Sequence, residues 1–231
     1  MNLKTNIEQS FLDMKAQSKL IAGWLTYWLA IFAFFVFAMK PNGVDYLNHY
    51  YLTCIFFIIS IAFGVKLFNL RVSFNAVKNL NKQLLYIVVL SLIFLVLGYI
   101  INLKLPLSDK LVEFIYSKHI LFPLFKFETS LTKIVDIAFQ QSMIIGLVLV
   151  LYGRLKSRAR VIIIFTIVFF LLHMPLLTIF SWSGLIFILP SLLAGFIFSY
   201  LILCFNYGIV YSFFVHQFFY IALGIILRLY V

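Results

Sequence analysis

Residues Leu84–Asn102 read LLYIVVLSLIFLVLGYIIN, without a charged side chain among them. An α-helix needs about 20 predominantly apolar residues to cross the hydrocarbon core of a bilayer, which is about 30 Å thick. Of the 231 residues in the chain, 65% are hydrophobic and 11% are charged, whereas a soluble domain averages about 45–50% and about 25%. The sequence therefore predicts an integral membrane protein and excludes a soluble domain, a disordered chain and a coiled coil.

Further apolar runs of similar length occur along the whole chain. They are Leu20–Met39, Tyr51–Leu70, Leu131–Tyr152, Val161–Phe180, Gly184–Leu203 and Tyr207–Leu229. We therefore predict an all-α bundle of seven transmembrane helices. An eighth span at residues 107–126 is the alternative, but charged side chains such as Lys110 and Glu113 interrupt it. We expect this segment to be an interfacial or re-entrant helix, interrupted at Pro123.

The polar side chains at membrane depth are unevenly divided along the chain. The first three apolar runs contain no carboxylate and no histidine, whereas the later runs contain both. No internal repeat and no long linker separates two domains. We therefore expect one membrane domain over residues 1–231, in which residues 1–130 supply scaffold helices plus the interfacial segment and residues 131–231 supply a functional core.

The net charge of +11 is concentrated in short segments between the apolar runs. With seven spans, the three most basic segments lie on the same side of the membrane. Their basic residues are Lys4, Lys15 and Lys19 in the N-terminal tail, Lys66, Arg71, Lys78 and Lys82 in the second segment, and Arg154, Lys156, Arg158 and Arg160 in the third. Cytoplasmic loops carry an excess of Lys and Arg, so we expect a cytoplasmic N-terminus, contact with membrane lipids and no nucleic-acid partner.

Polar residues of three different spans reach similar depths in the membrane. At about 1.5 Å of rise per residue, Gln140, His173 and His216 lie between about 12 and 16 Å below the outer face of a 30 Å core. Asp136 precedes Gln140 by one helical turn, and Gln141 follows it directly. Ionisable and amide groups in hydrocarbon cost free energy and often mark a functional site. We therefore predict that these groups share a cavity.

Structural roles for the same residues remain open alternatives. Each histidine could donate to a neighbouring backbone carbonyl, and the Gln140–Gln141 pair could bond across helices. For Asp136 we favour an ion pair with Lys133 over a catalytic role. Two histidines and one carboxylate fall short of the three protein ligands usual for catalytic zinc, so we expect no metal and no cofactor.

The second half of the chain resembles the CAAX prenyl protease and bacteriocin-processing family of intramembrane proteases, also called CPBP or Abi. Members of that family share Glu-Glu-x-x-x-Arg on one span, Phe-x-x-x-His on the next and His-x-x-x-Asn on a later span. Phe169–His173, FFLLH, matches the second motif, and the segments around Gly195–Tyr200 and Tyr211–His216 resemble the approach to the third. The first motif aligns with residues 140–145. The resemblance implies a CAAX-protease-like bundle.

The departures from the family pattern fall on its catalytic residues. The two glutamates are replaced by Gln140 and Gln141, the arginine by Ile145, and the asparagine by Tyr220. The resemblance implies that the first glutamate is a general base acting on water. A neutral amide cannot accept that proton. Tyr220 could still donate one hydrogen bond to an oxyanion, and Asp136 is a conceivable substitute base.

Two functions are therefore compared. The favoured one is a degenerate family member without catalysis: a scaffold, regulator or immunity-type protein that binds a membrane or envelope protein or peptide. The alternative is a divergent intramembrane endopeptidase that uses His173 and His216. Family analogy places either one in a bacterial inner membrane. A transporter or channel is a more distant third class, because few charged residues would line a path.

Overall fold

The computed structural model describes residues 3–70, 74, 77–118 and 120–230, and the structure is 87% helical without a strand in those residues. The elements are α1 (Leu3–Phe34), η1 (Phe35–Met39), η2 (Lys40–Asn42), α2 (Tyr50–Leu67), α4 (Leu80–Lys104), α5 (Asp109–Lys118), η3 (Phe122–Leu124), α6 (Phe127–Leu155), α7 (Arg158–His173), α8 (Leu176–Phe180), η4 (Ser181–Gly184), α9 (Leu185–Cys204) and α10 (Gly208–Tyr230). Within the described residues, 7 helices are long and apolar enough to cross a membrane. The predicted all-α membrane fold is confirmed.

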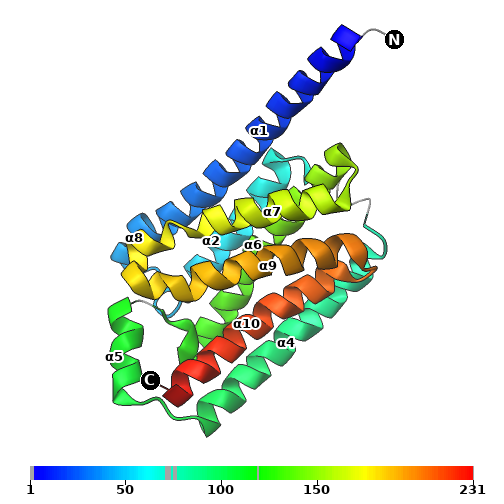
Figure 1. Ribbon diagram of the computed structural model, residues 1–231. Helices are drawn as coiled ribbons and strands as arrows, with labels where there is room; N and C mark the ends of the chain where they lie inside the picture. Colours follow the sequence, from blue (N-terminus) through cyan, green and yellow to red (C-terminus); the bar gives the residue numbers. More distant parts are fainter. Residues whose placement is uncertain (1–2, 71–73, 75–76, 119, 231) are drawn as a thin grey trace.

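The segment proposed as an alternative eighth span is not a transmembrane helix. Its helix, α5, has 10 residues, and a helix of that length is about 15 Å long, half the thickness of the hydrocarbon core. Leu111 and Ile115 on one side of α5 are fully buried, while Lys110 and Glu113 are exposed. Pro123 then lies in the short helix η3. Helix α5 therefore packs across one end of the bundle (Figure 1).

One predicted span is divided where proline interrupts the backbone hydrogen bonds. The apolar run Val161–Phe180 predicts a single helix, but α7 ends at His173 and a short helix, α8, follows from Leu176. Pro175 lies between them and has no N–H to donate to a helical carbonyl. The consequence is that His173 is the last residue of α7, although Arg158–Thr178 remains one candidate membrane span.

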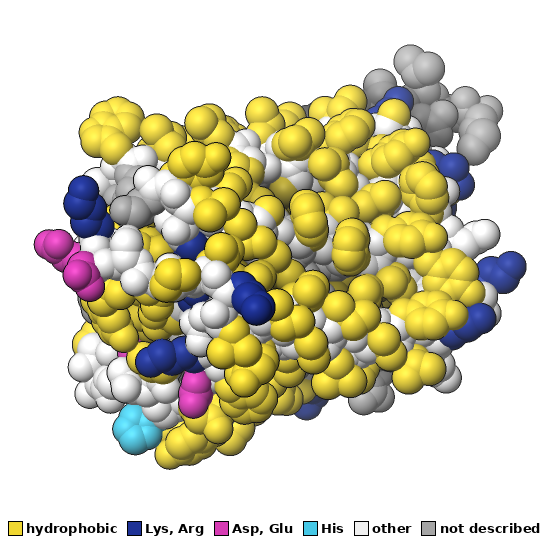
Figure 2. All heavy atoms as spheres, turned by 90° about the horizontal axis from the view of Figure 1, so that it is seen from below, with side chains coloured by type: hydrophobic (Ala, Val, Ile, Leu, Met, Phe, Trp, Pro, Cys, Tyr) yellow, Lys and Arg dark blue, Asp and Glu magenta, His cyan; other side chains and the backbone are white. Residues whose placement is uncertain are grey.

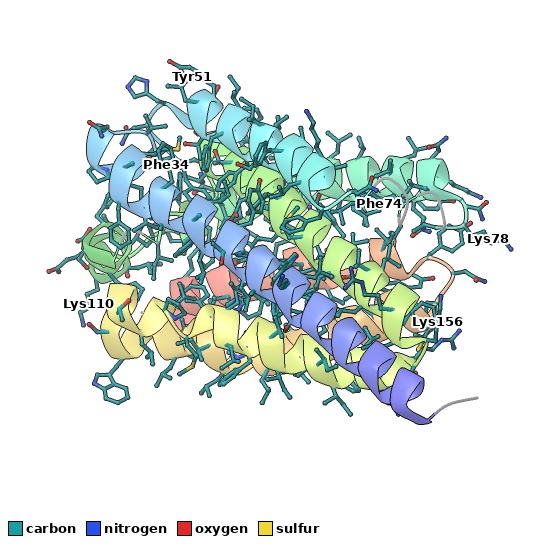
Figure 3. All side chains as sticks on the ribbon, turned by 90° about the horizontal axis from the view of Figure 1, so that it is seen from above. Phe34, Tyr51, Phe74, Lys78, Lys110 and Lys156 are labelled. Carbon is teal, nitrogen blue, oxygen red and sulfur yellow. The ribbon has the colours of Figure 1, made fainter. Side chains whose placement is uncertain are left out.

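Charged side chains lie mainly at the two ends of an apolar bundle (Figure 2). Figure 3 shows Lys78, Lys156 and the N-terminal end of α1 at one end, and Lys110 with Phe34 and Tyr51 at the other. The loops predicted to be basic therefore lie together; Arg71 falls outside the described residues. Between the ends, α4 and α10 lie side by side, as do α7 and α9 (Figure 1).

Both halves of the chain contribute to one aromatic core around α6. Trp24 and Trp28 of α1 pack with Phe139 of α6 and with Phe165 and Phe169 of α7. The indole nitrogen of Trp24 donates to the Met143 carbonyl at 3.0 Å. In a bilayer, helices associate through close packing and through hydrogen bonds of this kind, because lipid is as apolar as the protein core.

A buried arginine fixes the end of the bundle that contains α5. Arg228, near the end of α10, is 7% exposed. Its guanidinium donates to the carbonyls of Pro123 and Leu124 at 2.9 and 2.7 Å, and to Asn102 Oδ1 of α4 at 2.9 Å. The planar group with five donors suits several acceptors at once. Arg228 thereby links α10, α4 and η3 at this end of the bundle.

Candidate functional site

A cavity of about 420 Å³ lies where α1, α6, α7, α9 and α10 meet. This volume falls in the range of about 300–1,000 Å³ that is usual for small-molecule sites. Most of its lining is aliphatic and aromatic. The polar lining residues are Lys40, Tyr46, Lys133, Asp136, Gln140, His173, Ser191, His216 and Tyr220. Gln140, His173 and His216, which were predicted to lie at a common depth, therefore share one cavity.

The Asp136 carboxylate is held by three hydrogen-bond donors. Lys133 Nζ lies 2.7 Å from Oδ2, the Tyr46 hydroxyl donates to the same oxygen at 2.9 Å, and Gln140 Nε2 donates to Oδ1 at 2.9 Å. The preferred interpretation of Asp136 as the partner of Lys133 is thus confirmed. Both carboxylate oxygens are therefore occupied by donors from α6 and from the loop before α2.

Tyr46 comes from the loop between α1 and α2 and was not among the predicted site residues. Burial raises the pKa of its hydroxyl well above 10.0, and the neighbouring Asp136 carboxylate acts in the same direction. The phenol therefore keeps its proton at neutral pH and remains a donor. No sequence signal marks this tyrosine, because the loop folds back to α6 only in the tertiary structure.

Lys133 is buried between aromatic rings and its carboxylate partner. Its side chain is 7% exposed, and Nζ lies 3.7 Å from the centre of the Tyr220 ring and 5.7 Å from that of Tyr46. A cation over an aromatic face is attracted by the ring quadrupole, most strongly where water is excluded. Tyr220, expected as an oxyanion donor, therefore presents its ring face to Lys133.

The two adjacent glutamines point to different parts of the structure. Gln140 faces the cavity, whereas Gln141 is 1% exposed and is not a lining residue. Gln141 Nε2 donates to His216 Nδ1 at 3.0 Å, and the Ser212 hydroxyl donates to Gln141 Oε1 at 2.9 Å. Consecutive residues of a helix do not share a face. Gln141 therefore bonds α6 to α10, the structural alternative considered for the pair.

The hydrogen bonds of the two histidines assign them different tautomers. His173 Nδ1 lies 2.8 Å from the Phe169 carbonyl, which can only accept, so Nδ1 carries the proton and Nε2 is the acceptor. His216 Nδ1 accepts from Gln141, so its proton is on Nε2. These assignments follow from the hydrogen-bond network and not from observed hydrogens. His173 Nε2 is the imidazole nitrogen able to take a proton in the cavity.

No free carboxylate faces the cavity among the described lining residues. Gln140 cannot act as a base, and the Asp136 carboxylate is engaged by Lys133, Tyr46 and Gln140. Among the described residues, no three His, Cys, Asp or Glu side chains gather as a metal site would require. What remains is a cavity with an apolar wall, two imidazoles and lysine side chains.

Comparisons with family models, curated proteins and solved structures give no match to this chain.

Proposed function

We propose that the protein is a non-catalytic membrane protein, a scaffold, regulator or immunity-type protein, that binds a ligand drawn from the membrane or envelope in this cavity. The observation that carries the proposal is the state of Asp136, whose carboxylate accepts from Lys133, Tyr46 and Gln140. A hydrolase needs a base positioned to take a proton from water. Asp136, the carboxylate that lines the cavity, is instead committed to neighbouring side chains.

The position of the cavity supports a ligand that arrives through the bilayer. Leu193 of α9 and Phe218 of α10 both line it, and they are 62% and 57% exposed on the apolar outer surface. In a membrane that surface is covered by lipid. A ligand can therefore reach the cavity laterally, without crossing water.

The divergent intramembrane endopeptidase remains the second candidate because both histidines line the same cavity. In that mechanism His173 Nε2 would take the proton of a water that attacks a peptide carbonyl, and His216 Nε2–H would donate to the developing oxyanion. The resemblance to CPBP proteases adds support through the motif Phe169–His173. Gln140 and Gln141, in place of two glutamates, argue against it.

For location we propose a bacterial inner membrane with a cytoplasmic N-terminus. The support for the orientation is that Lys78, Lys156 and the N-terminal end of α1 lie at the same end of the bundle (Figure 3). The choice of a bacterial inner membrane is supported by the resemblance to the CPBP family.

A census of protein termini tests catalysis directly. Membranes from cells with the native protein, with the His173→Ala/His216→Ala variant, or with neither are compared by mass spectrometry of protein ends. We expect identical termini in all three. The exposed loop histidine His49 provides the control, as His49→Asn, because asparagine tolerates its positive φ of 46°. Termini that need both cavity histidines but not His49 would overturn the proposal in favour of the endopeptidase.

A second test restores the missing base. Gln140→Glu places a carboxylate at the cavity wall, where the CPBP pattern has its glutamate. For a binding protein whose remaining site has also diverged, we expect no new termini. New termini in this variant alone would show that the active site is complete apart from its general base, since such a base commonly contributes about 10²–10⁴-fold in rate.

A further inference from the structure

The polar part of the cavity carries a lysine that the cavity's own carboxylate does not neutralise. Asp136 is the acidic residue among the lining side chains, and it pairs with Lys133 at 2.7 Å. Lys40, at the end of the first span, also lines the cavity, and its Nζ lies 5.5 Å from the centre of the Phe35 ring. With neutral histidines, the lining therefore has one net positive charge.

The nearby acid Asp45 interacts with Lys40 electrostatically, yet it is not a lining residue. Its carboxylate accepts from the backbone N–H groups of Leu47 and Asn48 at 2.8 and 2.7 Å, which shapes the loop after α1. These bonds hold Asp45 in its loop but do not cancel its charge, which still acts on Lys40. Among the described residues Lys40 forms no ion pair, so its ammonium is open to an anionic group in the cavity.

The distribution of polar groups favours an acyl chain over an extended peptide. Backbone N–H and C=O groups in hydrocarbon must all find partners. The hydrogen-bonding side chains on α6 are gathered around Asp136. The walls from α9 and α10 are mostly apolar, and their Ser191 hydroxyl and His216 Nδ1 already have hydrogen-bond partners in the protein. An acyl chain needs no hydrogen bonds along that apolar wall.

We propose that the cavity binds a single-chain anionic lipid, with its carboxylate or phosphate head at Lys40 and its acyl chain between α7, α9 and α10. This rests on the proposed function and names its ligand class. The lipid enters past Leu193 and Phe218 from the bilayer. The anionic head brings the charge of the cavity to zero and replaces the water around Lys40 with a charge-assisted hydrogen bond.

Quenching of tryptophan fluorescence by brominated lipids tests this directly, because Trp28 lines the cavity. Bromine quenches an indole on contact. The full-length protein is studied in neutral detergent with Trp182→Phe as background, since Trp182 is 81% exposed and would report non-specific contact. The probes are a brominated fatty acid, a brominated lysophosphatidic acid and, as the neutral control, a brominated fatty alcohol.

We expect at least one anionic probe to bind about tenfold more tightly than the alcohol, as a charge-assisted hydrogen bond predicts. The anionic probe that binds more tightly then shows whether the head group is a carboxylate or a phosphate. Lys40→Gln should remove this preference, and Lys40→Arg should keep it. Lys110→Gln is the matched control, because Lys110 is an exposed lysine at the same end of the bundle (Figure 3).

Equal affinity for the acid and the alcohol would overturn the proposal, as would an anion preference that survives Lys40→Gln. Absence of quenching in protein shown to be folded by circular dichroism would overturn it too. None of these results concerns peptide-bond cleavage. The census of termini tests non-catalysis separately, so the two proposals can fail independently.

Discussion

Helices α4 and α6 are both long apolar spans, but they occupy opposite environments in the bundle. Helix α4 has the higher mean hydropathy, yet only 11% of the residues in its apolar stretch are buried inside the protein. In α6, 61% of the residues in the corresponding stretch are buried. In water the more apolar helix would be the buried one. In a bilayer lipid already solvates apolar side chains, so the interior is left for polar groups and for close packing.

The residues of the two helices show this reversal directly. Helix α4 presents side chains such as Leu92 and Val96 to lipid, and they are 57% and 58% exposed. Helix α6 buries Lys133, Asp136 and Gln141, all of which find partners inside the bundle. The helix with buried polar side chains, and not the more apolar one, therefore lies at the centre of the bundle. Three sets of substitutions test this comparison, in order of decreasing effect.

The largest effect is expected from Lys133→Met on α6, which leaves the Asp136 carboxylate buried without its cation. Removing one partner of a buried ion pair costs about 3–5 kcal/mol. The free energy of unfolding in mixed detergent micelles measures the loss. The double variant Lys133→Met/Asp136→Leu should regain most of it, since no unpaired charge remains. Equal losses in the single and double variants would contradict this account.

A smaller difference is expected between two leucines, one on each helix. Leu147 of α6 is 1% exposed, whereas Leu92 of α4 faces lipid. Because the reference state is itself in lipid, Leu147→Ala loses packing but little transfer free energy, and we expect about 1–3 kcal/mol. Leu92→Ala should cost less than about 0.5 kcal/mol. Similar costs in the same unfolding assay would mean that α4 has a protein partner instead of lipid.

The smallest effect is expected from the hydrogen bond between α6 and α10. Ser212→Ala removes the donor to Gln141 Oε1, and side-chain hydrogen bonds between membrane helices average about 0.6 kcal/mol. Ser199→Ala is the matched control, because that hydroxyl donates at 2.7 Å to Gly195 within its own helix. A cost for Ser199→Ala equal to that for Ser212→Ala would show that the bond across helices adds nothing.

Much of the fold could be predicted from the sequence because the spans are set by local composition. The run Leu84–Asn102 lies within α4, and the predicted span Leu131–Tyr152 lies within α6. The break after His173 was less evident, because hydropathy continues across Pro175 while the missing N–H ends the helix.

The candidate site could be predicted only in part. Helical rise placed Gln140, His173 and His216 at similar depths, and all three line the cavity. The same argument grouped Gln141 with Gln140, although the Gln141 side chain bonds to His216 and Ser212 of α10. Depth along a helix is set by residue number, whereas the direction of a side chain depends on which helices pack around it.

The apolar spans follow from the sequence, because length and composition act locally: 7 helices in the described residues are long and apolar enough to cross a membrane. The same local pattern identifies the polar side chains within those spans. Their partners, in contrast, come from the tertiary structure. It folds Tyr46 back onto Asp136, leaves Lys40 facing the cavity, and places Arg228 among carbonyls from distant segments. Such contacts join residues far apart in the chain, and no local pattern encodes them.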